Sequence, residues 1–341
     1  MIIDAHAHMT HNSFLTWLDT LGGTWAKNRA DRLRQTAKNR PHSIDVGLRL
    51  AQLDRNSIDF QVVTPGGGGI SGILPQDETT TLITIAKIIN DGMAKLMEES
   101  KGRLIGGGTV PLIGFEQGGS QEMTRAINSL GLKAITVPSH FKGKPLDIPE
   151  LESFWAQAAE MGVPIYIHPS SPGQHKDRTY EGDYDLSHNF GWPFETILSL
   201  SRLVFSGIME RYPNLKVVGH HLGGGLPFWW GRTNESYDLT NPQHAEVNKE
   251  IGGGLSKPLF DYFSLFYLDT AVGGSAEAIR CAYDVFGADR LIFATDAPNG
   301  PGSGEIRLET YPKVIKSLGL LEEDNDKIFA SNARNMLNLN Y

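Results

Sequence analysis

The sequence opens with two histidines whose spacing suits metal binding. His6 and His8 lie in a short apolar segment at the N-terminus, and side chains at positions i and i+2 of a strand point to the same face. A third imidazole, His168, follows Ile165-Tyr166-Ile167, and a carboxylate, Asp296, ends the segment 291–296. Three imidazoles and one carboxylate form a ligand set for a divalent cation. We predict a metal centre, with Zn²⁺ the leading ion and Mn²⁺ or Fe²⁺ as alternatives.

A second pair of histidines, His220 and His221, ends a short β-branched segment and precedes Leu-Gly-Gly-Gly-Leu-Pro. Adjacent residues of a strand face opposite sides, so one of the two should point into the fold and the other out. A polar residue at the inner tip of a strand suits a general acid/base, or a group that orients water at a metal. The pattern alone does not decide which of the two faces inward.

The segments that carry these residues belong to a regular alternation of strands and helices. Helix-like stretches such as 79–99, 150–161, 195–212 and 275–286 separate short β-branched runs. This alternation predicts parallel strands joined by right-handed crossovers. Eight such units close a (β/α)8 TIM-type barrel, and an open doubly wound sheet is the competing fold. The eight predicted strands are 2–8, 58–65, 104–111, 133–138, 163–168, 215–221, 263–269 and 291–296.

Two segments interrupt the alternation. Residues 12–50 form a basic excursion after the first strand, and residues 170–193 form a polar loop after the fifth. Long loops after barrel strands lie at the C-terminal mouth, where substrate sites are built. We expect one barrel domain over residues 1–341, with residues 12–50 as an insertion that acts as a lid.

The composition excludes several classes of protein. The formal net charge of −8 argues against nucleic acid as a partner, and no apolar run is long enough to span a membrane. The single cysteine, Cys281, and the N-terminus without signal-peptide character favour a cytoplasmic location. Gly67–Gly72 formally matches a dinucleotide fingerprint, but Pro75 follows and no acidic residue ends a second strand at the required distance. We therefore expect no organic cofactor and a small-molecule partner.

Taken together, the motifs resemble the amidohydrolase-related metal-dependent decarboxylases, a family that includes aminocarboxymuconate semialdehyde, resorcylate and carboxyvanillate decarboxylases. The resemblance covers nearly the whole chain. Its carriers are IIDAHAH, LAQLDRNSIDFQVVTP, GVPIYIHP, VVGHHLGGGLPFWWGR, DRLIFATDAP and SNARNML.

The resemblance implies a role for each matching residue. It makes His6, His8, His168 and Asp296 the metal ligands and His221 the catalytic histidine. It implies that Arg232 reaches a substrate carboxylate in the neighbouring subunit of a homodimer, and that an arginine of the excursion, for which Arg40 is the candidate, also binds carboxylate.

One departure from the wider amidohydrolase pattern bears on the reaction. Two-metal hydrolases often carry a bridging lysine at the end of the fourth strand, whereas the only lysine here, Lys133, stands at its start. A single metal is therefore expected. We predict a non-oxidative decarboxylase, a carboxy-lyase for an aromatic or unsaturated carboxylic acid, with Asp296 as both ligand and proton carrier. A mononuclear hydrolase or hydratase is the alternative.

Overall fold

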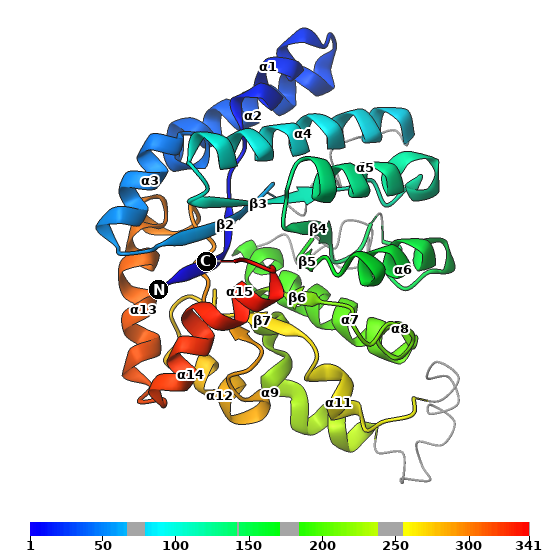
Figure 1. The fold of residues 1–341 in the computed structure, drawn as a ribbon, viewed down its shortest axis with the longest axis vertical. Coiled ribbons are helices and arrows are strands. Elements are labelled where there is room, and N and C mark those ends of the chain that lie inside the picture. The colour runs from blue at the N-terminus through cyan, green and yellow to red at the C-terminus, as the bar shows by residue number, and fades with distance from the viewer. Residues whose placement is uncertain (67–78, 142, 171–183, 238–254, 341) are drawn as a thin grey trace.

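The computed structural model describes residues 1–66, 79–141, 143–170, 184–237 and 255–340. Eight parallel strands lie in the sequential order β1 to β8 (Figure 1). Their bounds are β1 Ile3–His8, β2 Phe60–Thr64, β3 Leu104–Thr109, β4 Ala134–Pro138, β5 Ile165–His168, β6 Val217–Gly219, β7 Tyr267–Asp269 and β8 Leu291–Ile292. Each of these strands lies within one of the eight predicted segments.

The chain that continues from β8 closes the sheet against β1. The amide of Ala5 donates to the carbonyl of Phe293 at 2.8 Å, and the amide of His8 donates to the carbonyl of Ala297 at 2.7 Å. An isolated bridge also joins Ala7 to Ala297. The predicted (β/α)8 barrel is confirmed, and the open doubly wound sheet is wrong because the first and last strands bond to each other.

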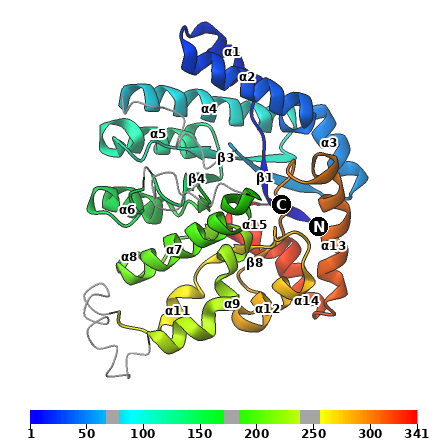
Figure 2. The ribbon, with the colours of Figure 1, turned by 180° about the vertical axis from the view of Figure 1, so that it is seen from behind.

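Helices surround the barrel on its outer side (Figures 1 and 2). The predicted helix 79–99 has the same bounds in the structure, and the other three predicted helices shift by a few residues or divide. The helices after β2 to β5 are α4 Thr79–Glu99, η2 Phe115–Gly119, α5 Ser120–Thr124, η3 Arg125–Ser129, η4 Pro149–Leu151, α6 Glu152–Met161, η6 Ser187–Gly191, α7 Trp192–Phe205 and α8 Ile208–Arg211. Those after β6 to β8 are α9 His220–Ser236, α11 Leu259–Phe263, α12 Ala276–Phe286, η8 Pro301–Gly304, α13 Glu305–Ser317, α14 Glu322–Asp326, η9 Lys327–Ser331 and α15 Asn332–Met336.

The barrel interior has an apolar floor beneath a polar layer. The floor is a hydrophobic cluster to which all eight strands contribute, and α15 closes it with Ala333 and Met336. Tyr166, Val218 and Tyr267 belong to this floor. The residues two positions further along the same strands are polar, so they share the inward face one layer higher. That layer contains the candidate site.

The excursion after β1 folds into helices α1 Asn12–Thr20 and α2 Thr24–Asn39, the short turn η1 Pro41–Ser43 and helix α3 Val46–Arg55. Helices α1 and α2 lie beside α4 on the outside of the barrel (Figure 1). The glycine-rich stretch 67–72 and most of the predicted loop 170–193 lie outside the described residues. Among the helices that are described, none combines the length and apolar character needed to cross a bilayer.

Candidate metal centre

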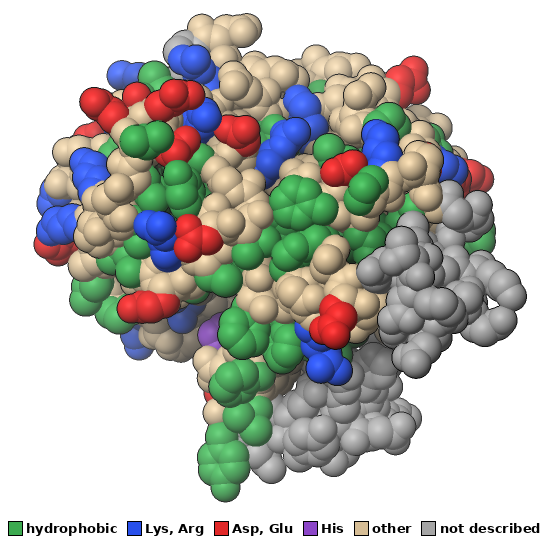
Figure 3. Space-filling view, turned by 90° about the horizontal axis from the view of Figure 1, so that it is seen from below, with side chains coloured by type: hydrophobic (Ala, Val, Ile, Leu, Met, Phe, Trp, Pro, Cys, Tyr) green, Lys and Arg blue, Asp and Glu red, His purple; other side chains and the backbone are tan. Residues whose placement is uncertain are grey.

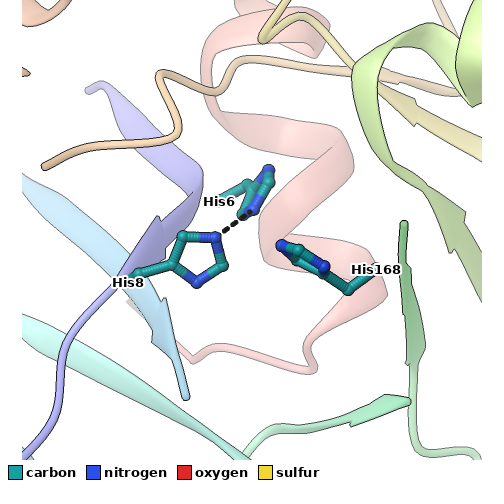
Figure 4. A group of neighbouring side chains, drawn as sticks. All are labelled: His6, His8 and His168. Carbon is teal, nitrogen blue, oxygen red and sulfur yellow. Dashed lines mark hydrogen bonds between the residues drawn. The ribbon is translucent and has the colours of Figure 1, made fainter. Parts of the chain in front are cut away.

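Three of the predicted ligands meet at the C-terminal end of the barrel. His6 and His8 come from β1 and His168 from β5, and their rings point toward one another (Figure 4). The Nε2 atoms of His6 and His8 lie 3.2 Å apart, and one ring nitrogen of each of the three histidines falls within 4.8 Å of the others. All three side chains are at least nine-tenths buried.

The fourth predicted ligand, Asp296, lies beside them just past β8. Its Oδ1 atom is 3.2 Å from Nε2 of His8 and 3.8 Å from Nε2 of His6. Two donors bound to one tetrahedral ion at 2.0–2.1 Å are about 3.4 Å apart, so these separations fit a shared cation. Asn299 donates to Oδ1 at 2.9 Å and Arg307 to Oδ2 at 3.0 Å, which fixes the carboxylate from its outer side.

Contacts behind the histidines orient all three rings in the same way. Nδ1 of His6 donates to Asp269 at 2.9 Å, and Nδ1 of His168 donates to the carbonyl of Pro169 at 2.7 Å. Nδ1 of His8 lies 3.1 Å from the hydroxyl of Thr64, which can itself donate to the carbonyl of Ala7. A proton on each Nδ1 leaves the Nε2 lone pairs free for a metal. The donor set therefore fits a divalent cation.

Both histidines of the second pair face the interior, so the prediction that one points outward is wrong. The reason is that β6 ends at Gly219 and the strand alternation ends with it. The five residues after His220, residues 221–225, form a left-handed turn in which φ of His221 is +56°. The ring of His220 stacks on His6 with centroids 3.6 Å apart. A ring nitrogen of His221 lies within 4.8 Å of donor atoms of His6 and Asp296.

A buried carboxylate that the sequence analysis missed, Asp269, connects these groups. It ends β7 on the inward face, two residues after Tyr267, and that position in a predicted inner strand was the available signal. Its Oδ2 accepts from His6 and, at 2.5 Å, from Nδ1 of His220.

These contacts set the protonation of the buried groups. Burial alone would raise the pKa of Asp269, but the two imidazoles hold it well below its usual value. Burial lowers the pKa of His220 to about 3. Burial likewise lowers the pKa of His221 and, to a greater degree, that of His168. Although burial opposes it, Asp269 raises the pKa of His6.

A cavity of about 550 Å³ opens above the ligands. His8, His168, His221 and Asp296 form its base, and four arginines line its wall: Arg29, Arg32, Arg40 and Arg307. The predicted substrate residue Arg40 thus reaches the cavity, where its guanidinium donates to Asn299. The other predicted substrate residue, Arg232, is exposed on α9 and is not part of the wall formed by the described residues of its own chain.

Comparisons with known proteins identify relatives of this chain. The chain is 32% identical over 256 residues to 2-amino-3-carboxymuconate-6-semialdehyde decarboxylase from Dictyostelium discoideum, covering 74% of this chain and 67% of the relative. It is 25% identical over 299 residues to gamma-resorcylate decarboxylase from Rhizobium sp. (strain MTP-10005), covering 85% and 86%.

A solved structure has the same fold. It is 5-carboxyvanillate decarboxylase from Novosphingobium aromaticivorans, complexed with manganese and 4-hydroxy-3-methoxy-5-nitrobenzoic acid. It superposes with a TM-score of 0.81 at 22% identity and covers 99% of this chain and 96% of its own. The model of the amidohydrolase family matches residues 3–339. The predicted resemblance is confirmed, and this chain belongs to the amidohydrolase family.

Proposed function

We propose that this protein is a metal-dependent, non-oxidative decarboxylase that acts on an aromatic or unsaturated carboxylic acid. The observation that carries the proposal is the approach of the His6, His8 and His168 rings to one another, with Oδ1 of Asp296 3.2 Å from Nε2 of His8, at the base of a cavity lined by arginines. The names of the two relatives support the same reaction, since both are decarboxylases. They favour it over the mononuclear hydrolase or hydratase.

The proposed cofactor is one divalent cation held by these four residues. Three imidazoles and a carboxylate suit Zn²⁺, which the sequence predicts, while the carboxyvanillate decarboxylase structure carries manganese. When bound, the ion would coordinate the substrate carboxylate and draw electron density from the carbon that loses CO₂. Metal analysis of the purified protein, followed by reconstitution with Zn²⁺ and with Mn²⁺, would decide between the two ions.

The residues around the cavity suggest how the chain assists. Cleavage of the carbon–carboxylate bond releases CO₂ and leaves an electron pair on the carbon. That carbon must then accept a proton. His221 lies beside Asp296 and is neutral at ordinary pH because burial lowers its pKa, so it is placed to relay that proton or to hold a substrate oxygen. The arginines of the wall would attract the anionic acid, and we assign Arg40 a contact with its carboxylate.

The proposed assembly is a homodimer in which Arg232 completes the partner's site. Hydrophobic side chains gather on one face of the molecule (Figure 3), and the exposed ones near α9 include Phe228 (74% exposed), Trp229 and Phe190. Both His221 and Phe228 line a second cavity, of about 460 Å³. It would give a partner's side chain access to the site. The lid role of residues 12–50 and the cytoplasmic location remain predictions.

The first test measures both the metal content and the decarboxylase activity of the wild-type protein and of a ligand variant. Wild-type protein should bind one divalent ion per chain and release CO₂ from some member of a panel of phenolic and muconic acids, while His168→Ala should lose metal and activity together. Near-stoichiometric metal in His168→Ala would refute the ligand assignment. Hydrolysis or hydration of a test substrate, without CO₂ release or ¹³C-bicarbonate exchange, would favour the alternative function.

A further inference from the structure

Both carboxylate oxygens of Asp269 accept hydrogen bonds from groups at or beside the site. Oδ2 accepts from Nδ1 of His6 at 2.9 Å and from Nδ1 of His220 at 2.5 Å. Oδ1 accepts from the backbone amides of His221 at 2.9 Å and Ala271 at 3.1 Å. The carboxylate is fully buried, so no solvent competes for these four bonds.

The Oδ2 contacts select one tautomer for each ring. A carboxylate oxygen accepts only, so both imidazoles must carry their proton on Nδ1. For His6 this leaves the Nε2 lone pair directed at His8 and Asp296. For His220, Nε2 is buried with no hydrogen-bond partner among the described residues, so Asp269 is the hydrogen-bonding anchor of that ring.

The Oδ1 contacts hold the backbone on which His221 stands. His221 has a left-handed φ of +56°, a conformation that is unfavourable for a residue with a side chain. The bond from its amide to Asp269 fixes this conformation at the point where the chain leaves β6. One oxygen of Asp269 therefore accepts from the proposed metal ligand His6, and the other accepts from the backbone of the turn that carries His221.

We propose that Asp269 is a positioning residue for both centres: it fixes the metal-binding tautomer of His6 and the left-handed turn that carries His221. The inference rests on the proposed metal site. It adds that metal affinity and the placement of the acid/base group depend on one side chain, which lines neither of the two cavities beside the site.

The variant Asp269→Asn tests the proposal because an amide has the same shape but only one acceptor. If its oxygen keeps the two backbone bonds, its NH₂ group faces both rings and forces their protons to Nε2, which blocks the His6 ligand atom. If the amide is reversed, its NH₂ group opposes the two backbone N–H groups and loosens the turn. In the first orientation we expect metal affinity to fall roughly 10–100-fold, measured by chelator competition. In the second we expect kcat at saturating metal to fall, because the turn that carries His221 is loosened.

Asp4→Asn is the matched control. Asp4 is an equally buried carboxylate in β1. Its side chain accepts from Thr295, from Gln61 and, at 3.4 Å, from the backbone amide of His6, but from no imidazole ring of the described residues. If only the loss of a nearby negative charge mattered, the two variants would behave alike. We expect Asp4→Asn to change metal affinity by less than about tenfold, below the range for a lost partner of a ligand.

A spectroscopic measurement keeps the proposal testable even if Asp269→Asn fails to fold. In wild-type protein loaded with Zn²⁺ and labelled with ¹⁵N-histidine, His220, assigned by comparison with His220→Gln, should be the Nδ1–H tautomer. In folded Asp269→Asn, an Nε2–H tautomer identifies the first orientation of the amide and a retained Nδ1–H tautomer identifies the reversed one. An Nε2–H tautomer in the wild type would overturn the inference, as would an Asp269→Asn enzyme in which both metal affinity and kcat equal those of the wild type. Wild-type protein that binds no metal would instead refute the proposed function.

Discussion

The chemistry of the site depends on where individual imidazole protons lie. In His6, His8 and His168, Nδ1 lies within hydrogen-bonding distance of an oxygen atom, so Nε2 is the nitrogen available to bind an ion. His221 differs from them, because it stands on a left-handed backbone and borders both cavities. This residue is therefore the one to test for a role in the reaction separate from metal binding.

We predict that His221→Asn keeps its metal but lowers kcat by roughly 10²-fold or more, the scale of a lost acid/base group. Metal content and steady-state kinetics measured on the same sample would check this. His11→Asn is a suitable control, since His11 caps α1 by accepting from the amide of Ser13, a task that asparagine performs well. A His221→Asn enzyme with unchanged kcat would reassign His221 to a structural role.

The residue types and spacings were enough to predict that the four proposed ligands lie at one end of the barrel. His6 and His8 share a face because the strand repeats every two residues, and the tips of β1 and β5 and the chain after β8 meet at one end of the barrel. Asp269 was missed although it stands on the inward face at the end of β7, because only the folded structure shows that it contacts His6 and His220. The inward position of both His220 and His221 was also missed, since it depends on a backbone reversal after Gly219.

At the scale of the elements, the start of α9, directly after β6, has an unusual backbone conformation. Three glycines, Gly223, Gly224 and Gly225, continue the left-handed turn that His221 begins. A side chain at Gly224 would also meet the carbonyl oxygen of Pro193, because a Cβ atom there would lie 2.0 Å away. The loop after β6 is thus fitted against the start of α7.

We predict that Gly224→Ala is far more harmful than Gly225→Ala. Both positions have a positive φ, which costs alanine roughly 1–2 kcal/mol, but nothing lies within 4 Å of a Cβ atom at Gly225. The additional clash at Gly224 should lower the free energy of unfolding well beyond that shared cost and reduce kcat through displacement of His221. Urea unfolding and kinetics of the two variants give the comparison, and equal destabilisation would contradict it.

At the scale of the whole molecule, the buried histidines link stability to pH. Burial holds the pKa values of His168, His220 and His221 below their usual value, so the folded protein stays neutral at these sites while the unfolded chain takes up protons near pH 6.5. His6 acts in the opposite sense, because Asp269 raises its pKa. Because three of these histidines have a lowered pKa and only His6 has a raised one, the free energy of unfolding of the metal-free protein should be smaller in acid.

We therefore expect the free energy of unfolding of the metal-free protein to fall as the pH is lowered from about 7.5 to about 5. Each of the three groups would contribute up to about 1.4 kcal/mol per pH unit below its unfolded pKa. Urea denaturation across this range would measure the slope, and His168→Asn should reduce it. Stability that rises toward acid pH would contradict the assignment of these histidines as neutral.

The proposed dimer yields a test of its own. Subunits carrying Arg232→Ala and subunits carrying His168→Ala should each be inactive alone. If Arg232 acts across the interface, a mixed dimer contains one intact site and one doubly damaged site, so partial activity returns after subunit exchange. Verified mixed dimers without activity, or a wild-type enzyme that is active as a monomer, would exclude the shared site.

The closure of the barrel by β1 and the segment after β8 also sets the order of events during protein synthesis. Thr295 donates to Asp4 from 291 positions away, and Asp296 follows it directly. At about 5–20 residues per second, roughly 15–60 s pass on the ribosome between the synthesis of the two ends. Throughout that time the first two histidines have no carboxylate partner from the last strand. The four proposed ligands are therefore first present together only after Asp296 has been synthesised, so coordination of a metal by all four must follow that point.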